Sequence, residues 1–145
     1  MKNSGFGIRK PSFRKISVGQ EINSEHELQK ACVKKLRAHN FLCFCTDVFN
    51  GLSFLKDVRS KSIYKQHMIA MGAAVGQPDL IILYRGEVTF VEFKYGKGKK
   101  STEQVAQTKL LESQGYPVLE WRTEKDCNDW MLSKMNLKAH DRSKK

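Results

Sequence analysis

The chain has 145 residues, a length that suits one compact domain and is too short for two full domains joined by a linker. Its 26 Lys and Arg residues against 15 Asp and Glu residues give a formal net charge of +11, so nucleic acid is the expected partner class, ahead of an acidic protein or a membrane surface. No apolar run approaches the roughly 20 residues needed to span a bilayer, and the basic start has no apolar signal core, so we expect a soluble cytoplasmic protein with no membrane partner.

The first half of the chain predicts a helix and a strand after a basic arm. Residues 1–22 are rich in Lys, Arg, Ser and Gly and are expected to form a flexible arm. Ser24 is a good N-cap, Glu27 has the capping-box position, and apolar residues at helical spacing then predict a helix over about 25–39. The apolar, aromatic-rich run 41–49 predicts the first strand.

The middle of the chain predicts a basic insertion followed by a hairpin. Residues 52–77 are expected to be partly helical, because 60–71 can form a helix before the next glycines break it. Two strands at 80–84 and 88–94 are rich in β-branched and aromatic residues, and a tight turn at 85–87 separates them.

The last third predicts a helix capped by Ser101 with Gln104 three residues later, then a strand, then a helix capped by Thr123. These elements predict an α/β fold of one domain, over residues 23–136, with a central mixed sheet of about four strands flanked by helices. We expect a helix over 101–114 ended by Gly115, a strand over 116–121, a helix over about 124–135 and a basic tail over 137–145.

Four cysteines offer little for metal binding, since the only close spacing is a C-x-C inside an apolar run. That spacing is typical of a strand rather than of a zinc knuckle. We therefore expect reduced thiols packed in or near the core at Cys32, Cys43, Cys45 and Cys127.

The hairpin carries the residues best suited to catalysis and metal binding. Alternate residues of a strand share a face, so Glu92 and Lys94 should project together. A hairpin centred on the Arg-Gly turn also sets Asp79 opposite Glu92, with Cβ atoms about 5 Å apart, where two carboxylates repel unless a cation or a proton lies between them. This pair suits Mg²⁺ or Mn²⁺. Lys94 would orient or help to deprotonate the attacking water and stabilise charge in the transition state.

Each of these motifs also has an ordinary explanation. A Glu-x-Lys pattern in a strand is often a surface ion pair, and a Pro-Asp pair is often a turn. What favours catalysis is the combination, because one hairpin places both carboxylates on otherwise apolar strands next to a Gly- and Lys-rich loop and a capped helix.

Four segments in this order resemble a known family. GQPDLII at 76–82, FVEFK at 90–94, GKGKKSTEQ at 96–104 and LESQGYPV at 111–118 closely resemble the VRR-NUC domain of the PD-(D/E)XK nuclease superfamily. The resemblance runs from about Ser24 to Arg122 and leaves the insertion at 52–77 unexplained.

The resemblance implies a metal-dependent deoxyribonuclease. It implies Asp79 and Glu92 as metal ligands, with the Phe93 carbonyl as a third oxygen, Lys94 as the catalytic lysine and Gln104 as a glutamine near the active site or the DNA backbone. The cofactor would be Mg²⁺ or Mn²⁺, and no nucleotide cofactor is expected.

A further acid is implied on the first helix, in an E-x-x-[IL]-Q pattern. This chain matches the pattern with Glu25, which would be an outer metal ligand, while Glu27 is the alternative and one of the two would only cap the helix. The basic loop that follows the catalytic strand precedes a helix N-terminus, where phosphate binds well, although it is also an ordinary solvated loop. We expect DNA contacts from Lys97, Lys99, Lys100 and Ser101.

Members of the family that stand alone resemble dimeric nucleases acting on branched DNA, which implies a homodimer that cuts structures such as Holliday junctions in recombination or repair. The same residues would serve a nuclease for flaps, ends or plain duplex. A non-catalytic DNA-binding protein, whose carboxylates only hold the hairpin together, is the alternative from another class.

Overall fold

The structure, a computed structural model, describes residues 22–49, 52 and 55–141. It confirms the predicted α/β class and the predicted order of helices and strands. The elements are α1 (Glu25–Ala38), β1 (Leu42–Cys45), α2 (Val58–Ala70), β2 (Leu80–Tyr84), β3 (Glu87–Phe93), α3 (Thr102–Ser113), β4 (Val118–Trp121) and α4 (Glu124–Asp141).

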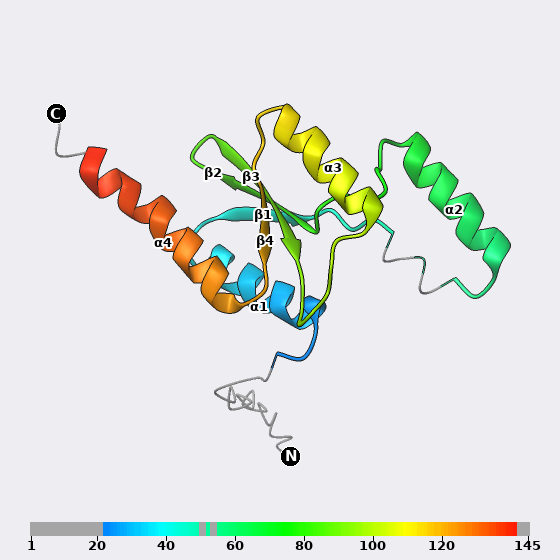
Figure 1. Ribbon diagram of the computed structural model, residues 1–145, viewed down its shortest axis with the longest axis horizontal. Coiled ribbons are helices and arrows are strands. Elements are labelled where there is room, and N and C mark those ends of the chain that lie inside the picture. The colour runs from blue at the N-terminus through cyan, green and yellow to red at the C-terminus, as the bar shows by residue number, and fades with distance from the viewer. Residues whose placement is uncertain (1–21, 50–51, 53–54, 142–145) are drawn as a thin grey trace, which may run out of the picture.

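The four strands form one mixed sheet in the order β1-β2-β3-β4. β1, β2 and β3 are antiparallel neighbours, and β4 lies parallel to β3. Helices α1 and α4 pack together on one face of this sheet, and α3 lies on the other side, against β4 (Figure 1). The two interior strands are β2 and β3, and β3 carries Glu92 of the candidate site.

The hairpin of β2 and β3 has the predicted register. Leu80 pairs with Val91 and Tyr84 pairs with Glu87, so the turn is the two residues Arg85 and Gly86 and does not include Glu87. Their φ angles of 54° and 84° are those of a turn whose twist matches the right-handed twist of the strands.

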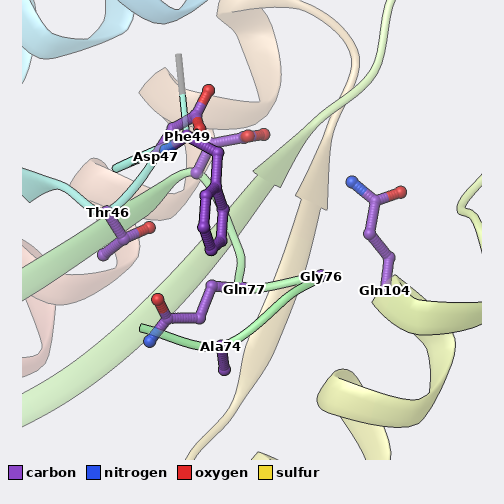
Figure 2. Close-up of a pocket in the computed structure, with 8 residues that line it drawn as sticks. Thr46, Asp47, Phe49, Ala74, Gly76, Gln77 and Gln104 are labelled. Atoms are coloured by element: carbon purple, nitrogen blue, oxygen red, sulfur yellow. Dashed lines mark hydrogen bonds between the residues drawn. The ribbon is translucent and has the colours of Figure 1, made fainter. Parts of the chain in front are cut away.

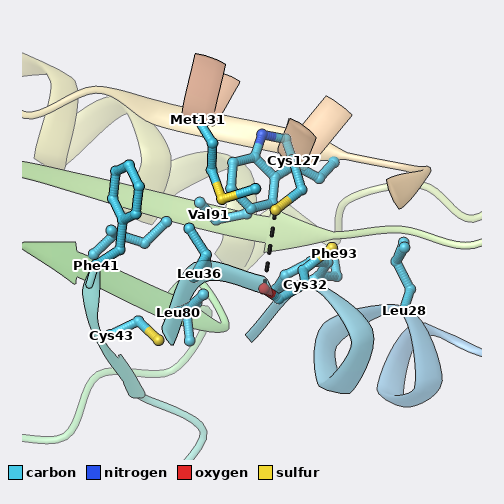
Figure 3. Close-up of a cluster of buried hydrophobic side chains, with 12 residues drawn as sticks. Leu28, Cys32, Leu36, Phe41, Cys43, Leu80, Val91, Phe93, Cys127 and Met131 are labelled. Carbon is cyan, nitrogen blue, oxygen red and sulfur yellow. Dashed lines mark hydrogen bonds between the residues drawn. The ribbon is translucent and has the colours of Figure 1, made fainter. Parts of the chain in front are cut away.

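The core lies between the sheet and the α1–α4 layer (Figure 3). Ser24 begins α1 by accepting a hydrogen bond from the Glu27 N–H at 3.2 Å. Leu28, Cys32 and Leu36, each four residues apart, then lie on one buried face of that helix. Fully burying one such leucine stabilises the fold by about 1.5–3 kcal/mol, so this face anchors the helix.

Aromatic rings form a chain of contacts through the core, from Tyr84 beside the hairpin turn to Trp121 at the end of β4. The Phe41 ring stacks on Tyr84 with centroids 3.9 Å apart, and the Trp130 ring lies 5.5 Å from Phe41 and 5.7 Å from Trp121. These contacts join α4 to both edges of the sheet. All four cysteines are free thiols, as predicted.

Cys45 is exposed, contrary to the expectation that every thiol packs in or near the core. It is the last residue of β1, which is shorter than the predicted run 41–49. The strand ends because the Asp47 side chain accepts a hydrogen bond from the Phe49 N–H at 3.2 Å and turns the chain away from the sheet. Cys45 therefore lies beyond the last core residue of the strand, beside the Gln29 side chain.

The ends of the described chain differ from expectation in one respect. α4 continues past the predicted end near Met135 to Asp141, because no glycine or proline stops it. The predicted arm, residues 1–22, lies outside the described residues except for Ile22, which packs against the core. None of the helices in the described part of the chain is long and apolar enough to cross a membrane.

Candidate active site

Glu92 and Lys94 form a buried ion pair on β3. The two side chains share one face of the strand, as predicted, while Val91 and Phe93 point into the core on the other face. Lys94 Nζ donates to Glu92 Oε1 at 2.7 Å, and the two residues are only 5% and 2% exposed. A buried pair of this kind adds little net stability over an apolar pair, because both charges lose their hydration.

Gln104 completes the surroundings of Glu92 from the other side of the sheet. Its Nε2 donates to Glu92 Oε1. Its Oε1 accepts from the Ser101 N–H at 2.9 Å, and its own N–H donates to Ser101 Oγ at 3.2 Å. The capping box that begins α3 therefore also fixes the amide that holds the Glu92 carboxylate.

Asp79 lies at the start of β2, one residue before the ladder of the hairpin begins. Its Oδ2 accepts a hydrogen bond from the Phe93 N–H at 2.7 Å. Its main-chain oxygen accepts from the Thr46 N–H at 3.0 Å. The ladder thus stops at Leu80, before the predicted pairing of Asp79 with Glu92, because the Asp79 side chain occupies the next donor.

The carboxyl groups of Asp79 and Glu92 both have raised pKa values. Burial raises the pKa of Asp79, and the negative charges of Glu25 and Asp47 raise it further, against the opposing Phe93 N–H and Lys94 charge. Burial also raises the pKa of Glu92, with a contribution from the Asp79 charge, against the opposing hydrogen bond from Lys94. Both sites therefore gain from additional positive charge.

Lys94 is held as a cation. Burial acts to lower its pKa, but the hydrogen bond to Glu92 and the charges of Glu92, Glu25 and Asp79 together raise it above the usual value. This raised pKa favours the role of a fixed positive charge over that of a general base, because the ammonium does not release its proton readily near neutral pH.

Glu25 and Glu27 have different surroundings. The Glu27 carboxylate accepts from the Asn23 N–H at 2.7 Å, the reciprocal half of the cap that begins α1. The Glu25 carboxylate accepts from the Tyr95 N–H at 3.3 Å and contributes to the pKa shifts of Asp79 and Lys94. The structure therefore turns Glu25 toward the candidate site and uses Glu27 as the cap.

A cavity of about 170 Å³ adjoins Asp79 and Gln104, with Phe49 and Gln104 on opposite sides of it (Figure 2). The segments before and after α2 both line it. The sequence did not single out Asp47, Phe49 or Gln77 as site residues, because they belong to a predicted strand and an insertion. The lining residues are Thr46, Asp47, Phe49, Ala74, Gly76, Gln77, Asp79 and Gln104.

The basic loop between β3 and α3 is held in place by a residue that the sequence did not single out. Arg122 donates from its two terminal nitrogens to the carbonyl oxygens of Gly96 and Gly98 at 2.9 and 3.0 Å. Of the predicted DNA contacts, Lys97 and Lys99 are exposed. Lys100 is half-buried, and its charge helps to lower the pKa of Glu92 against the effect of burial.

The donor set suits a hard divalent cation in its chemistry. Asp79 and Glu92 offer carboxylate oxygens in a site where a positive charge would relieve their raised pKa values, and Mg²⁺ commonly uses one or two carboxylates together with water and substrate phosphate. Within the described part of the chain, no group of three or more His, Cys, Asp or Glu side chains is already gathered to hold a metal ion.

No family model and no curated protein sequence matches this chain. A solved structure described as "VRR_NUC domain" resembles it with a TM-score of 0.51, at 21% sequence identity, over 74% of this chain and 92% of the other. The chain therefore has the fold of a VRR_NUC domain.

Proposed function

We propose that this protein is a metal-dependent DNA endonuclease that hydrolyses phosphodiester bonds at the site formed by Asp79, Glu92 and Lys94. The observation that carries the proposal is the buried Glu92–Lys94 pair, held by Gln104 and next to a second carboxylate with a raised pKa. A purely structural pair would gain little from burial. Perturbed, interacting charges beside a cavity are typical of catalytic sites.

A divalent ion, Mg²⁺ or Mn²⁺, would be held by Asp79 and Glu92, with the Phe93 carbonyl as a further oxygen and Glu25 as an outer ligand. When bound, such an ion polarises the phosphoryl oxygen and lowers the pKa of a coordinated water. Gln104 would keep the Glu92 carboxylate oriented, through the hydrogen bond that joins the two side chains.

Lys94 would supply the positive charge that stabilises the extra negative charge on the phosphate during attack by water. Its raised pKa supports this electrostatic role. The net charge of +11 and the exposed Lys97 and Lys99 beside the site would attract the phosphate backbone without reading its sequence. Lys100 and Ser101 would add contacts at the start of α3.

The first test is cleavage of labelled DNA by Asp79→Ala and Lys94→Ala in Mg²⁺, in Mn²⁺ and in EDTA. We expect wild-type cleavage with either metal and none in EDTA. Each variant should lose about 100-fold or more of the cleavage rate but retain DNA binding.

Glu112→Ala and Lys109→Ala provide matched controls, because they remove the same kinds of charge from the exposed surface of α3. They should cleave like wild type. Intact cleavage by both Asp79→Ala and Lys94→Ala would reject the proposal and leave a DNA-binding protein whose carboxylates only support the hairpin.

We further propose that the enzyme is a homodimer that cuts branched DNA, since one site cuts one strand and symmetric cleavage of a junction needs two. An apolar sheet face supports pairing. This face consists of two rows of side chains that run across the strands, and the next row along the sheet contains Glu92. One row is Leu42, Leu83 and Val88, and the other is Phe44, Ile81, Phe90 and Val118.

A substrate panel separates the finer possibilities. It contains a four-way junction, 5′ and 3′ flaps, plain duplex and single strand. The proposal predicts that the junction is cut fastest, with paired cuts in its two opposite strands. Faster cleavage of flaps, ends or duplex would replace the junction assignment with one of these activities and leave the catalytic residues unchanged.

A further inference from the structure

Helix α2 stands apart from the rest of the fold (Figure 1). It has 13 residues, none of them buried, and it packs against no other helix or strand of the described structure. Tyr64 makes a link to the body, by donating from its hydroxyl to the Val48 carbonyl at 3.2 Å. Because most helices of this length owe their stability to packing of one face, α2 lacks the usual source of stability.

The charge on α2 is of one sign. Arg59, Lys61 and Lys65 lie on the helix, and no Asp or Glu occurs anywhere in residues 58–78. The acid that precedes the helix in sequence, Asp57, is its N-cap and accepts a hydrogen bond from the Ser60 N–H at 2.7 Å. Lys61 and Lys65 are one turn apart on the same side, where like charges destabilise a helix. A bound anion would offset this repulsion.

The three exposed apolar residues of α2 do not form a stripe that a protein groove could accept. Val58, Ile63 and Ile69 are 84%, 58% and 45% exposed, and at 100° per residue Ile63 lies well away from the other two. The basic side chains are interspersed among them. Charge complementarity is thus the stronger guide to the partner of this helix.

The position of α2 links it to the candidate active site. The segments that precede and follow it supply Thr46, Asp47 and Phe49 and then Ala74, Gly76 and Gln77 to the cavity beside Asp79. Hydrogen bonds at the start of α3 lower the pKa of Glu103, and the charge of Lys65 adds to that lowering. The charge of Lys65 thus acts at the start of α3, next to Gln104 of the candidate site.

We propose that α2 is a DNA-backbone contact element, in which Arg59, Lys61 and Lys65 bind phosphates of the duplex that leads into the active site. This inference rests on the proposed function. It names the surface that holds the substrate. The contacts would fix the position of the duplex without reading its bases, and phosphate binding would supply the stabilisation that α2 does not obtain from packing.

The test compares two double variants with equal changes of charge. Lys61→Gln with Lys65→Gln removes the basic pair of α2. Lys30→Gln with Lys34→Gln removes a pair with the same spacing from the exposed side of α1. Binding of a labelled duplex is measured in EDTA, which prevents cleavage, at several salt concentrations between about 50 and 200 mM.

We expect the α2 variant to lower the slope of log K against log salt by about 1.8, which is about 0.9 for each lost phosphate contact. The α1 variant should change the slope by less than half as much. Amide hydrogen exchange provides a second measurement. Exchange in residues 58–70 should be fast in the free wild-type protein and slow at least 10-fold on addition of duplex.

The outcomes separate this inference from the proposed function. Equal slopes in the two variants, or no protection of α2 by DNA, would overturn the role of α2 while cleavage by wild type still stood. Normal DNA binding through α2 without any metal-dependent cleavage would overturn the nuclease and leave the contact element. Wild-type protein that binds neither plain duplex nor a four-way junction would overturn both.

Discussion

At the scale of single residues, Gly76 has the most constrained surroundings near the site. It lies where the chain returning from α2 passes the first turn of α3. Its φ is +81°, and a Cβ there would be 2.6 Å from the Glu103 carbonyl oxygen and 2.7 Å from the Gln104 nitrogen. Because Gln104 also holds Glu92, this close approach places the segment before β2 directly against the part of α3 that contacts the candidate site.

The change Gly76→Ala should therefore damage both stability and activity. We expect a loss of about 3 kcal/mol or more in the free energy of unfolding, because backbone strain of 1–3 kcal/mol adds to a clash with main-chain atoms. Cleavage should fall at least 10-fold even in the folded fraction. The measurements are urea unfolding and cleavage rates per folded molecule.

The change Gly72→Ala is a control that introduces backbone strain without a steric clash. Gly72 also has a positive φ, of +98°, but a Cβ there meets nothing within 4 Å. This variant should lose only about 1–2 kcal/mol and keep its cleavage rate. Equal effects of the two substitutions would mean that the approach to α3 is unimportant.

At the scale of elements, the cap of α3 joins helix formation to the site. Gln104 makes the reciprocal hydrogen bond of the capping box with Ser101 and also donates to Glu92. Ser101 takes part in the box, whereas the donor to Glu92 is Gln104. The two residues can therefore be used to separate stabilisation of the helix from orientation of the carboxylate.

Ser101→Ala and Gln104→Ala should lose similar stability, about 1 kcal/mol each by thermal or urea unfolding. Their activities should differ. At saturating DNA, Gln104→Ala leaves Glu92 with one fewer donor and should lower the cleavage rate about 10-fold or more, whereas Ser101→Ala, whose proposed contact is to the DNA backbone, should stay within about 3-fold of wild type. A cleavage rate for Gln104→Ala as high as that for Ser101→Ala would restrict Gln104 to the cap.

The start of α4 has an acid cap with a pH-dependent contribution. Asp126 Oδ2 accepts from the N–H groups of Arg122 and Thr123 and from the Thr123 hydroxyl. Burial raises the pKa of Asp126, but these hydrogen bonds outweigh burial and lower it below the usual value. The resulting stability is present above the unfolded pKa of about 3.9 and is lost as the pH falls through the lower folded pKa.

Asp126→Ala should thus be about 1 kcal/mol less stable than wild type near pH 7, and the difference should shrink as the pH falls below about 4. Urea unfolding at several pH values between 7 and 2 measures it. Asp129→Ala, which removes an exposed acid paired with Lys125, should cause a smaller loss. A difference for Asp126→Ala that stayed constant with pH would rule out the charged form as the source of stability.

The elements that the sequence predicted well are those determined by neighbouring residues. Turn chemistry and alternation in the hairpin predicted its register, and Ser24 and Ser101 predicted the starts of two helices. The end of β1 and the clamp made by Arg122 were not predicted. The Arg122 clamp depends on a loop distant in sequence, as when Arg122 reaches the carbonyl of Gly96, and a local pattern does not contain such information. The end of β1 comes instead from a local turn, in which Asp47 accepts from the Phe49 N–H, inside a run whose apolar and aromatic residues favoured a longer strand.

The residues of the candidate site were likewise predicted only where a local pattern placed them. Glu92 and Lys94 are two residues apart on one strand, so strand periodicity was enough to place them together. The surroundings of Glu25 and Glu27 could not be separated by spacing alone, because both occupy the first turn of the same helix. Only the fold brings the Tyr95 N–H to Glu25 and leaves Glu27 at the cap.

At the scale of the whole molecule, charge and apolar surface have opposite effects on self-association. The net charge of +11 makes two copies repel each other over most of their surface. The apolar sheet face carries no charged residue in its two rows, and Leu42 and Phe44 on it are 54% and 51% exposed. It is therefore the surface where a second copy gains most burial for least repulsion.

Phe44→Asp should convert the proposed dimer into a monomer, because it places a charge that loses its hydration within each paired face. Sedimentation velocity measures the change. With a four-way junction as substrate, the variant should make single nicks in place of paired cuts, while the rate of each nick stays near that of wild type, since Phe44 is not one of the proposed catalytic residues.

Leu132→Asp is the matched control, because Leu132 is 52% exposed but lies on α4. It should remain dimeric and should still make paired cuts. A monomeric wild type on and off DNA would reject pairing altogether. A dimer that survives Phe44→Asp would instead move the interface to another surface, because two buried carboxylates related by a two-fold axis have no counter-charge on this face.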